Sequence, residues 1–215
     1  MKLNLPLWAQ IAANVLSLIL ALALGWKPEL ILFLFWAENV IIGTWQVPRL
    51  MLAETAAPDE SSDTVMTKKG GLSNFVGKLF FVGFFCFHYG LFTFVHGSFV
   101  FELFLNESLT ENNLVKVLFS TPGLQLALLG IFASHAIQLL QDIVSGEATR
   151  AKRDAVMMSP YKRIVILHLV LLGSGFLLIQ LPYPIIAVVL LFTIKISMDI
   201  AKERKIQKQQ EAHVT

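Results

Sequence analysis

The stretch FVGKLFFVGFFCFHYGLFTFVHGSFVF, residues 75–101, decides the fold class of this chain. It is almost wholly apolar and exceeds the roughly 20 residues that a helix needs to cross a hydrocarbon core. Because each residue adds about 1.5 Å, a helix of this length must tilt or emerge from the bilayer at one end. The sequence predicts a transmembrane helix that carries two histidines, His88 and His96, inside the membrane.

The same apolar pattern recurs along the chain, which is 55% hydrophobic and only 15% charged. This balance is too apolar for an ordinary water-soluble domain. We predict an all-α, polytopic integral membrane helical bundle of about six transmembrane helices, forming one domain over residues 1–215. The predicted spans are Leu7–Trp26, Glu29–Leu52, Phe75–Phe101, Pro122–Val144, Arg163–Leu181 and Pro182–Ala201, the last two forming a hairpin.

Lys and Arg gather on one side of the predicted bundle. Alternate loops carry fourteen of these residues on one face and two, Lys27 and Lys116, on the other. The positive-inside rule places the richer face, both termini and the polar linker 53–74 in the cytoplasm. The net charge of +2 is too small to indicate nucleic-acid binding, so the partners we expect are the lipid bilayer and, at the basic loops, anionic lipid.

Labelling of single cysteines tests this topology. The only native thiol, Cys86, has no partner for an internal disulfide and would first be replaced. A cysteine at position 60 should react from the cytoplasmic side and one at position 110 from the external side. Labelling of position 60 from the external side and of position 110 from the cytoplasmic side would show that the bundle has the opposite orientation.

Ionisable residues lie inside the spans at similar depths. Counting inward from the external ends places three histidines and a lysine roughly 18–20 Å deep and a glutamate roughly 13 Å deep. Ionisable groups in hydrocarbon are costly, so they are candidate functional residues. The layer comprises Glu38, His88, His135, His168 and Lys195, with His96 two turns outward of His88 and Asp199 one turn from Lys195.

Two patterns predict how helices face each other. His135, Gln138 and Asp142 recur at i, i+3 and i+7, a polar stripe that should face the bundle interior. In the span 75–101, glycines recur every seven residues and predict a strip that another helix can approach closely. These glycines are Gly83, Gly90 and Gly97.

The donor types in the polar layer suit a metal ion. Imidazoles of His88, His135 and His168 with the carboxylate of Glu38 would bind Zn, Fe or another first-row metal and leave a position for water. With Glu38 or Tyr89 as catalytic acid or base, metal-bound water would support a metal-dependent membrane hydrolase. A metal-binding polar site of unknown activity is therefore our first prediction.

Other functions would use the same residues. A proton-coupled small-solute transporter needs titratable groups along a wetted path. A haem protein would use His88 and His135 from facing helices, and each histidine could instead be a structural interhelical hydrogen-bonding group. Lys195 opposes a metal unless Asp199 or Glu38 neutralises it. Enzyme status, substrate and oligomeric state stay open. The transporter path would comprise Glu38, His88, His135, Lys195, Asp199 and Asp142.

Several short motifs occur in a characteristic order from the second predicted span to the sixth. They are FWAEN at 35–39, FHYG at 87–90 with HG at 96–97, SPYKR at 159–163 leading to His168, and Lys195 with Asp199. In this order and spacing the chain resembles an uncharacterised bacterial integral membrane family that carries a domain-of-unknown-function label. The resemblance implies a multi-pass protein of the bacterial inner membrane with this architecture and no inherited activity.

Overall fold

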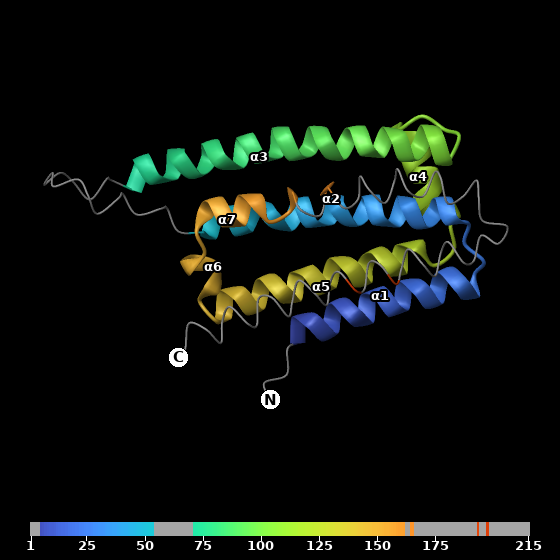
Figure 1. Ribbon diagram of the computed structural model, residues 1–215, viewed down its shortest axis with the longest axis horizontal. Coiled ribbons are helices and arrows are strands. Elements are labelled where there is room, and N and C mark those ends of the chain that lie inside the picture. The colour runs from blue at the N-terminus through green and yellow to red at the C-terminus, as the bar shows by residue number, and fades with distance from the viewer. Residues whose placement is uncertain (1–4, 54–70, 162–163, 166–192, 194–196, 198–215) are drawn as a thin grey trace, which may run out of the picture.

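The computed structural model describes residues 5–53, 71–161, 164–165, 193 and 197 (Figure 1). The elements in these ranges are helices, and four stretches are long and apolar enough to cross a membrane. They agree with the first four predicted spans to within a few residues. These stretches are α1 (Leu5–Ala23), α2 (Pro28–Leu52), α3 (Gly71–Phe99) with its continuation to Phe104, and α5 (Leu124–Val144).

The predicted fifth and sixth spans and most of the linker 53–74 lie outside the described residues. The same holds for His168, Lys195 and Asp199. The four predicted spans that can be compared lie side by side in the bundle, with α1 and α3 antiparallel to α2 and α5 (Figure 1).

The turn from α1 to α2 is specified by local residue chemistry. Gly25 adopts a φ of +63°, a left-handed conformation that suits glycine. Pro28 then opens α2 at a position where its fixed φ and missing N–H are tolerated. The indole N–H of Trp26 donates to the carbonyl oxygen of Pro122 at 3.0 Å, which ties this turn to the start of α5.

The connection between α3 and α5 contains two further helical segments. α3 passes into a π-helical turn, η1 (Val100–Phe104), whose closing bond runs from the N–H of Leu105 to the oxygen of Val100. The short helix α4 (Glu111–Ser120) follows, and its N-cap Thr110 accepts a hydrogen bond from the N–H of Asn113 at 3.3 Å.

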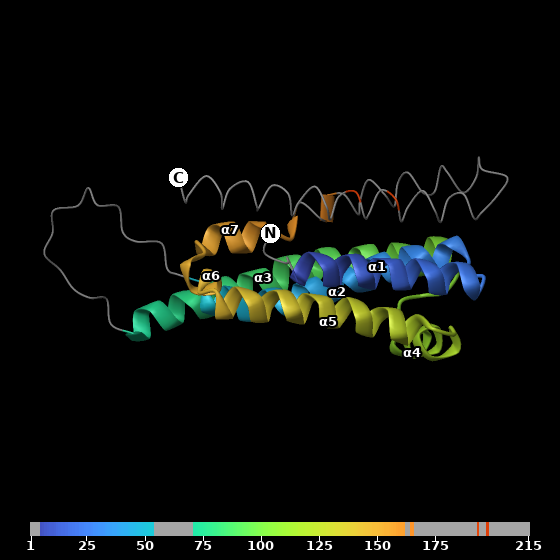
Figure 2. The same ribbon diagram turned by 90° about the horizontal axis from the view of Figure 1, so that it is seen from below.

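After α5 the chain turns back toward α2. The short helices α6 (Glu147–Arg150) and α7 (Arg153–Met158) follow, and α7 contacts α2 (Figure 2). Gln46 fixes this contact, because its side-chain amide donates to the carbonyl oxygen of Val156 and lies 3.5 Å from the hydroxyl of Ser159. The same carbonyl also accepts the backbone N–H of Ser159 at 3.2 Å, so the amide adds a second hydrogen bond at the C-terminal end of α7.

The centre of the bundle is α2. It contacts α3, α5 and η1, whereas α1 packs on α5, and Phe33, Trp36 and Phe101 form a buried cluster with ring centroids 5.6–6.1 Å apart. In contrast to the buried residues of α2, the outer face of α3 is exposed, and its residues Phe80 and Phe87 are 70% and 74% exposed. Exposed rings of this size suit contact with lipid.

Only part of the predicted glycine strip packs closely. A Cβ on Gly97 would lie 2.7 Å from the Trp36 ring, so this glycine permits the contact of α3 with α2. Gly83 and Gly90 have no atom of the described chain within 4 Å of the corresponding position. The spacing places the three glycines on one strip, but of the three only Gly97 is buried. A second close approach occurs at Gly43, against the ring of Tyr89.

Candidate functional site

A buried carboxylate and imidazole face each other between α2 and α5. The Nε2 atom of His135 lies 3.9 Å from Oε1 of Glu38, and the two side chains are only 8% and 5% exposed. Glu38 follows the buried aromatic run of α2, and His135 lies in the middle of α5. Helices α2 and α5 run parallel (Figure 1), and Glu38 and His135 are the eleventh and twelfth residues of their helices, so the two come from similar levels of the bundle.

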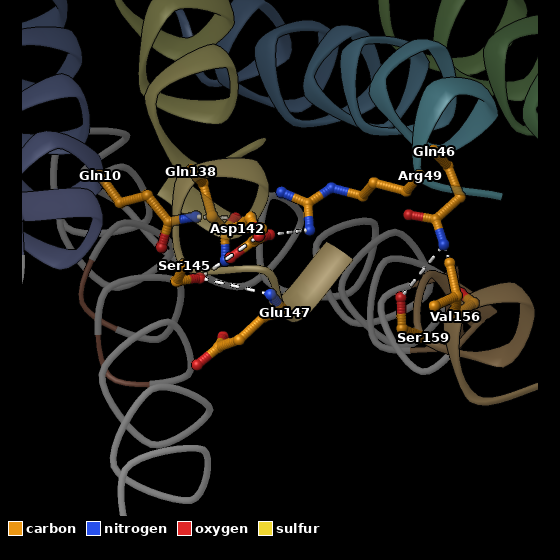
Figure 3. A network of polar contacts seen from close by, with 9 residues as sticks. All are labelled: Gln10, Gln46, Arg49, Gln138, Asp142, Ser145, Glu147, Val156 and Ser159. Atoms are coloured by element: carbon orange, nitrogen blue, oxygen red, sulfur yellow. Dashed lines mark hydrogen bonds and ion pairs between the residues drawn. The ribbon is translucent and has the colours of Figure 1, made fainter. Parts of the chain in front are cut away.

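Further polar contacts continue along α5 toward its C-terminal end (Figure 3). The side-chain amide of Gln10 on α1 donates to Oε1 of Gln138 at 3.4 Å. One turn further, Asp142 forms an ion pair with Arg49 of α2. The predicted orientation of the stripe is therefore confirmed, because His135, Gln138 and Asp142 each meet a side chain of α1 or α2.

His88 belongs to a different polar contact. Its Nδ1 lies 2.9 Å from the hydroxyl of Tyr161, in the SPYKR motif that follows α7. Burial raises the pKa of the Tyr161 phenol, so this residue, which precedes the predicted fifth span, keeps its proton and can donate to His88. Phe84 stacks on the His88 ring at 5.4 Å between centroids. The motif thus has a structural role in joining α3 to the returning chain.

Two other predicted residues are engaged with the backbone. The buried ring of His96 donates through Nδ1 to the carbonyl oxygen of Phe92 at 2.7 Å. The hydroxyl of Tyr89 donates to the carbonyl oxygen of Asn39 at 3.0 Å, which ties α3 to α2. The hydroxyl predicted to act as a catalytic acid or base therefore binds a helix carbonyl.

The predicted metal site is not supported by the part of the chain that can be described. In that part, no group of three or more His, Cys, Asp or Glu side chains is placed to hold a metal ion. Glu38 and His135 meet, but His88 is not grouped with them and instead contacts Tyr161. Similar depth did not bring the histidines together, because depth leaves the rotation of α3 undetermined. The fourth predicted ligand, His168, lies outside the described residues.

The sequence interpretation missed the partners of the stripe. Arg49 is one of the fourteen positive residues that indicate the cytoplasmic face, and the sequence predicts no contact for it or for Gln10. A signal was present, since Arg49 lies three helical turns beyond Glu38 and therefore on the same face of α2. Two ionisable residues on one face of α2, opposite a stripe with a histidine and an aspartate, indicate paired contacts between two helices.

Comparison with known proteins yields one family. Its model, described as a family of unknown function (DUF6498), matches residues 1–215. No curated protein and no solved structure matches the chain. Since the match runs over the full length, it includes both helices that carry the buried Glu38–His135 pair.

Proposed function

The chain belongs to DUF6498, and we propose that it is a multi-pass protein of the bacterial inner membrane whose Glu38–His135 pair binds and releases a proton inside the bundle. The observation that carries this proposal is the 3.9 Å approach of two almost fully buried ionisable side chains. The four membrane-length helices and the exposed rings on α3 support the membrane assignment.

The chemistry of the pair favours a shared proton. With one proton between them, carboxyl and imidazole are either both neutral or form an ion pair, and both states avoid a net charge in a medium of low dielectric constant. Gaining or losing a further proton leaves one uncompensated charge. Such a pair therefore couples proton binding to any movement that separates α2 from α5 or admits water between them.

The polar contacts along α5 indicate the end of the bundle toward which the proton is released. The Gln10–Gln138 contact and the Arg49–Asp142 pair lie between the buried pair and the end of α5, which the distribution of Lys and Arg assigns to the cytoplasm. Amide and carboxylate groups can exchange hydrogen bonds with water. We therefore assign the protein to the proton-coupled transporters of small solutes, with the cytoplasmic end as the exit.

Infrared difference spectroscopy across a pH titration tests proton binding without a known substrate. The wild-type protein should show a carboxylic C=O band that appears and disappears with pH. Glu38→Gln should abolish this band, and His135→Gln should move its midpoint by about 1 pH unit or more, because it removes the adjacent ionisable group. His88→Gln removes a histidine that contacts Tyr161 and serves as the matched control. An unchanged band in Glu38→Gln would refute the proposal.

A metal ion held by Glu38 and His135 is the second candidate, because the two side chains offer one oxygen and one nitrogen ligand. A third ligand would have to come from elsewhere, and His168 was the sequence-based choice. Elemental analysis of the purified protein tests this candidate. Zinc or iron retained by wild type and His88→Gln but lost from Glu38→Gln and His135→Gln would replace the proton proposal and reopen the hydrolase interpretation. A Soret absorbance band would instead indicate haem.

A further inference from the structure

Two adjacent basic residues at the start of α7 have opposite environments. Lys152 is exposed, whereas Arg153, the first residue of α7, is 5% exposed. Within the described part of the chain, no acceptor lies within hydrogen-bonding distance of Nε or Nη2 of Arg153, and no carboxylate forms an ion pair with it. Arg153 is therefore distinct from the exposed basic residues of its loop.

A buried guanidinium without a partner is energetically unfavourable, because arginine stays protonated in proteins and a buried charge needs compensation. The Phe81 ring lies 5.2 Å from its Cζ atom and stabilises one face of the guanidinium by a cation–π contact. The Nε–H and Nη2–H groups lie on one edge of the guanidinium, and the ring, which covers its face, accepts no hydrogen bond from them. That edge is the one that holds a carboxylate or phosphate through two parallel hydrogen bonds.

The third nitrogen of the guanidinium, Nη1, lies beside Gly77 of α3. A Cβ on Gly77 would lie 3.8 Å from Nη1 of Arg153 and would meet no other described atom within 4 Å. Glycine therefore leaves space next to Nη1. Lys78, the next residue of α3, donates its ammonium group to the carbonyl oxygen of Met51 at 2.8 Å and adds a positive charge one residue from Gly77.

We propose that Arg153 anchors a site for a phosphate oxyanion, entered beside Gly77. The phosphate first contacts Nη1, and a small displacement of the first turn of α7 exposes the Nε–Nη2 edge for the two parallel bonds. The exposed apolar residues Val76, Leu79 and Phe80 of α3 adjoin Gly77 in sequence, so acyl chains can pack beside a bound headgroup. This arrangement favours the phosphate of an anionic membrane lipid as the source.

Native mass spectrometry of the protein released from bilayer nanodiscs tests the site. Nanodiscs of phosphatidylglycerol and of phosphatidylcholine are compared, with inorganic phosphate as a competing probe. Wild type should retain phosphatidylglycerol, and Arg153→Gln should weaken its binding at least about tenfold, as expected for loss of charge-assisted hydrogen bonds. Lys152→Gln removes the same charge one residue away and should weaken binding by less than about fivefold.

A second variant separates the site from folding effects and from net charge. Gly77→Leu keeps all charges, replaces glycine by a better helix former, and fills the space beside Nη1, so it should also lose phosphatidylglycerol. Inorganic phosphate that displaces the lipid from wild type but has no effect on Arg153→Gln would support the site and identify free phosphate as a competing source. Equal losses in Arg153→Gln and Lys152→Gln, or unchanged binding in Gly77→Leu, would overturn the proposal.

Discussion

Gly97→Ala should lower the free energy of unfolding by about 1–3 kcal/mol, because it forces a methyl group into a packed contact. The added Cβ would lie 2.7 Å from Cε2 of Trp36. The Trp36 ring is buried, and its N–H donates to the carbonyl oxygen of Thr93 at 2.8 Å, so the ring cannot move without losing this bond.

Gly90→Ala is the matched control for this substitution. It lies in the same helix, seven residues earlier, where the added methyl group would meet no described atom within 4 Å. Replacing an unconstrained helical glycine by alanine should stabilise by up to about 1 kcal/mol. Reversible unfolding in detergent, followed by circular dichroism, would measure both values. Equal effects at Gly97 and Gly90 would contradict the close contact between α2 and α3.

Asp142→Ala should lower the free energy of unfolding by about 2 kcal/mol, because it leaves the guanidinium of Arg49 partly buried and unpaired. The two side chains are 22% and 21% exposed, so the effect should be smaller than for a fully buried pair. The double variant Arg49→Met with Asp142→Ala removes both charges and should cost less than Asp142→Ala alone.

An exposed ion pair provides the comparison. Lys116 and Glu107 approach to 2.9 Å, but their side chains are 64% and 39% exposed. Glu107→Ala should therefore change the free energy of unfolding by at most about 1 kcal/mol. A double-mutant cycle for each pair gives the coupling energy directly. Coupling at Arg49–Asp142 no larger than at Lys116–Glu107 would show that the pair between α2 and α5 does not stabilise the bundle.

The first four spans could be predicted from sequence because the membrane imposes a simple length requirement on each of them. The inward face of α5 could also be predicted, since the spacing of His135, Gln138 and Asp142 fixes one side of a helix. Neither argument determines how one helix is rotated or shifted against another. For this reason Glu38 and His135 meet although their predicted depths differ, and His88 turns to a different partner.

The partner of His88 illustrates the second limit. Tyr161, which contacts His88, follows the short helix α7. This helix lies beside α2, where the side-chain amide of Gln46 donates a hydrogen bond to it. Hydropathy assigned that segment to a basic loop, because a helix of six residues gives no periodic signal of its own. Likewise, Lys152 and Arg153 are both positive in the sequence, and only packing separates an exposed charge from a buried one.

The order of the helices has a consequence for biosynthesis. Arg49 and its partner Asp142 are 93 residues apart in the chain, and α3 and α4 are made between them. At a synthesis rate of about 5–20 residues per second, roughly 5–20 s pass between the synthesis of Glu38 and Arg49 and the synthesis of their contact residues on α5. During that interval α2 holds two ionisable side chains whose contact residues on α5, His135 and Asp142, have not yet been synthesised. Helix α2 is therefore made well before either of these contacts with α5 can form.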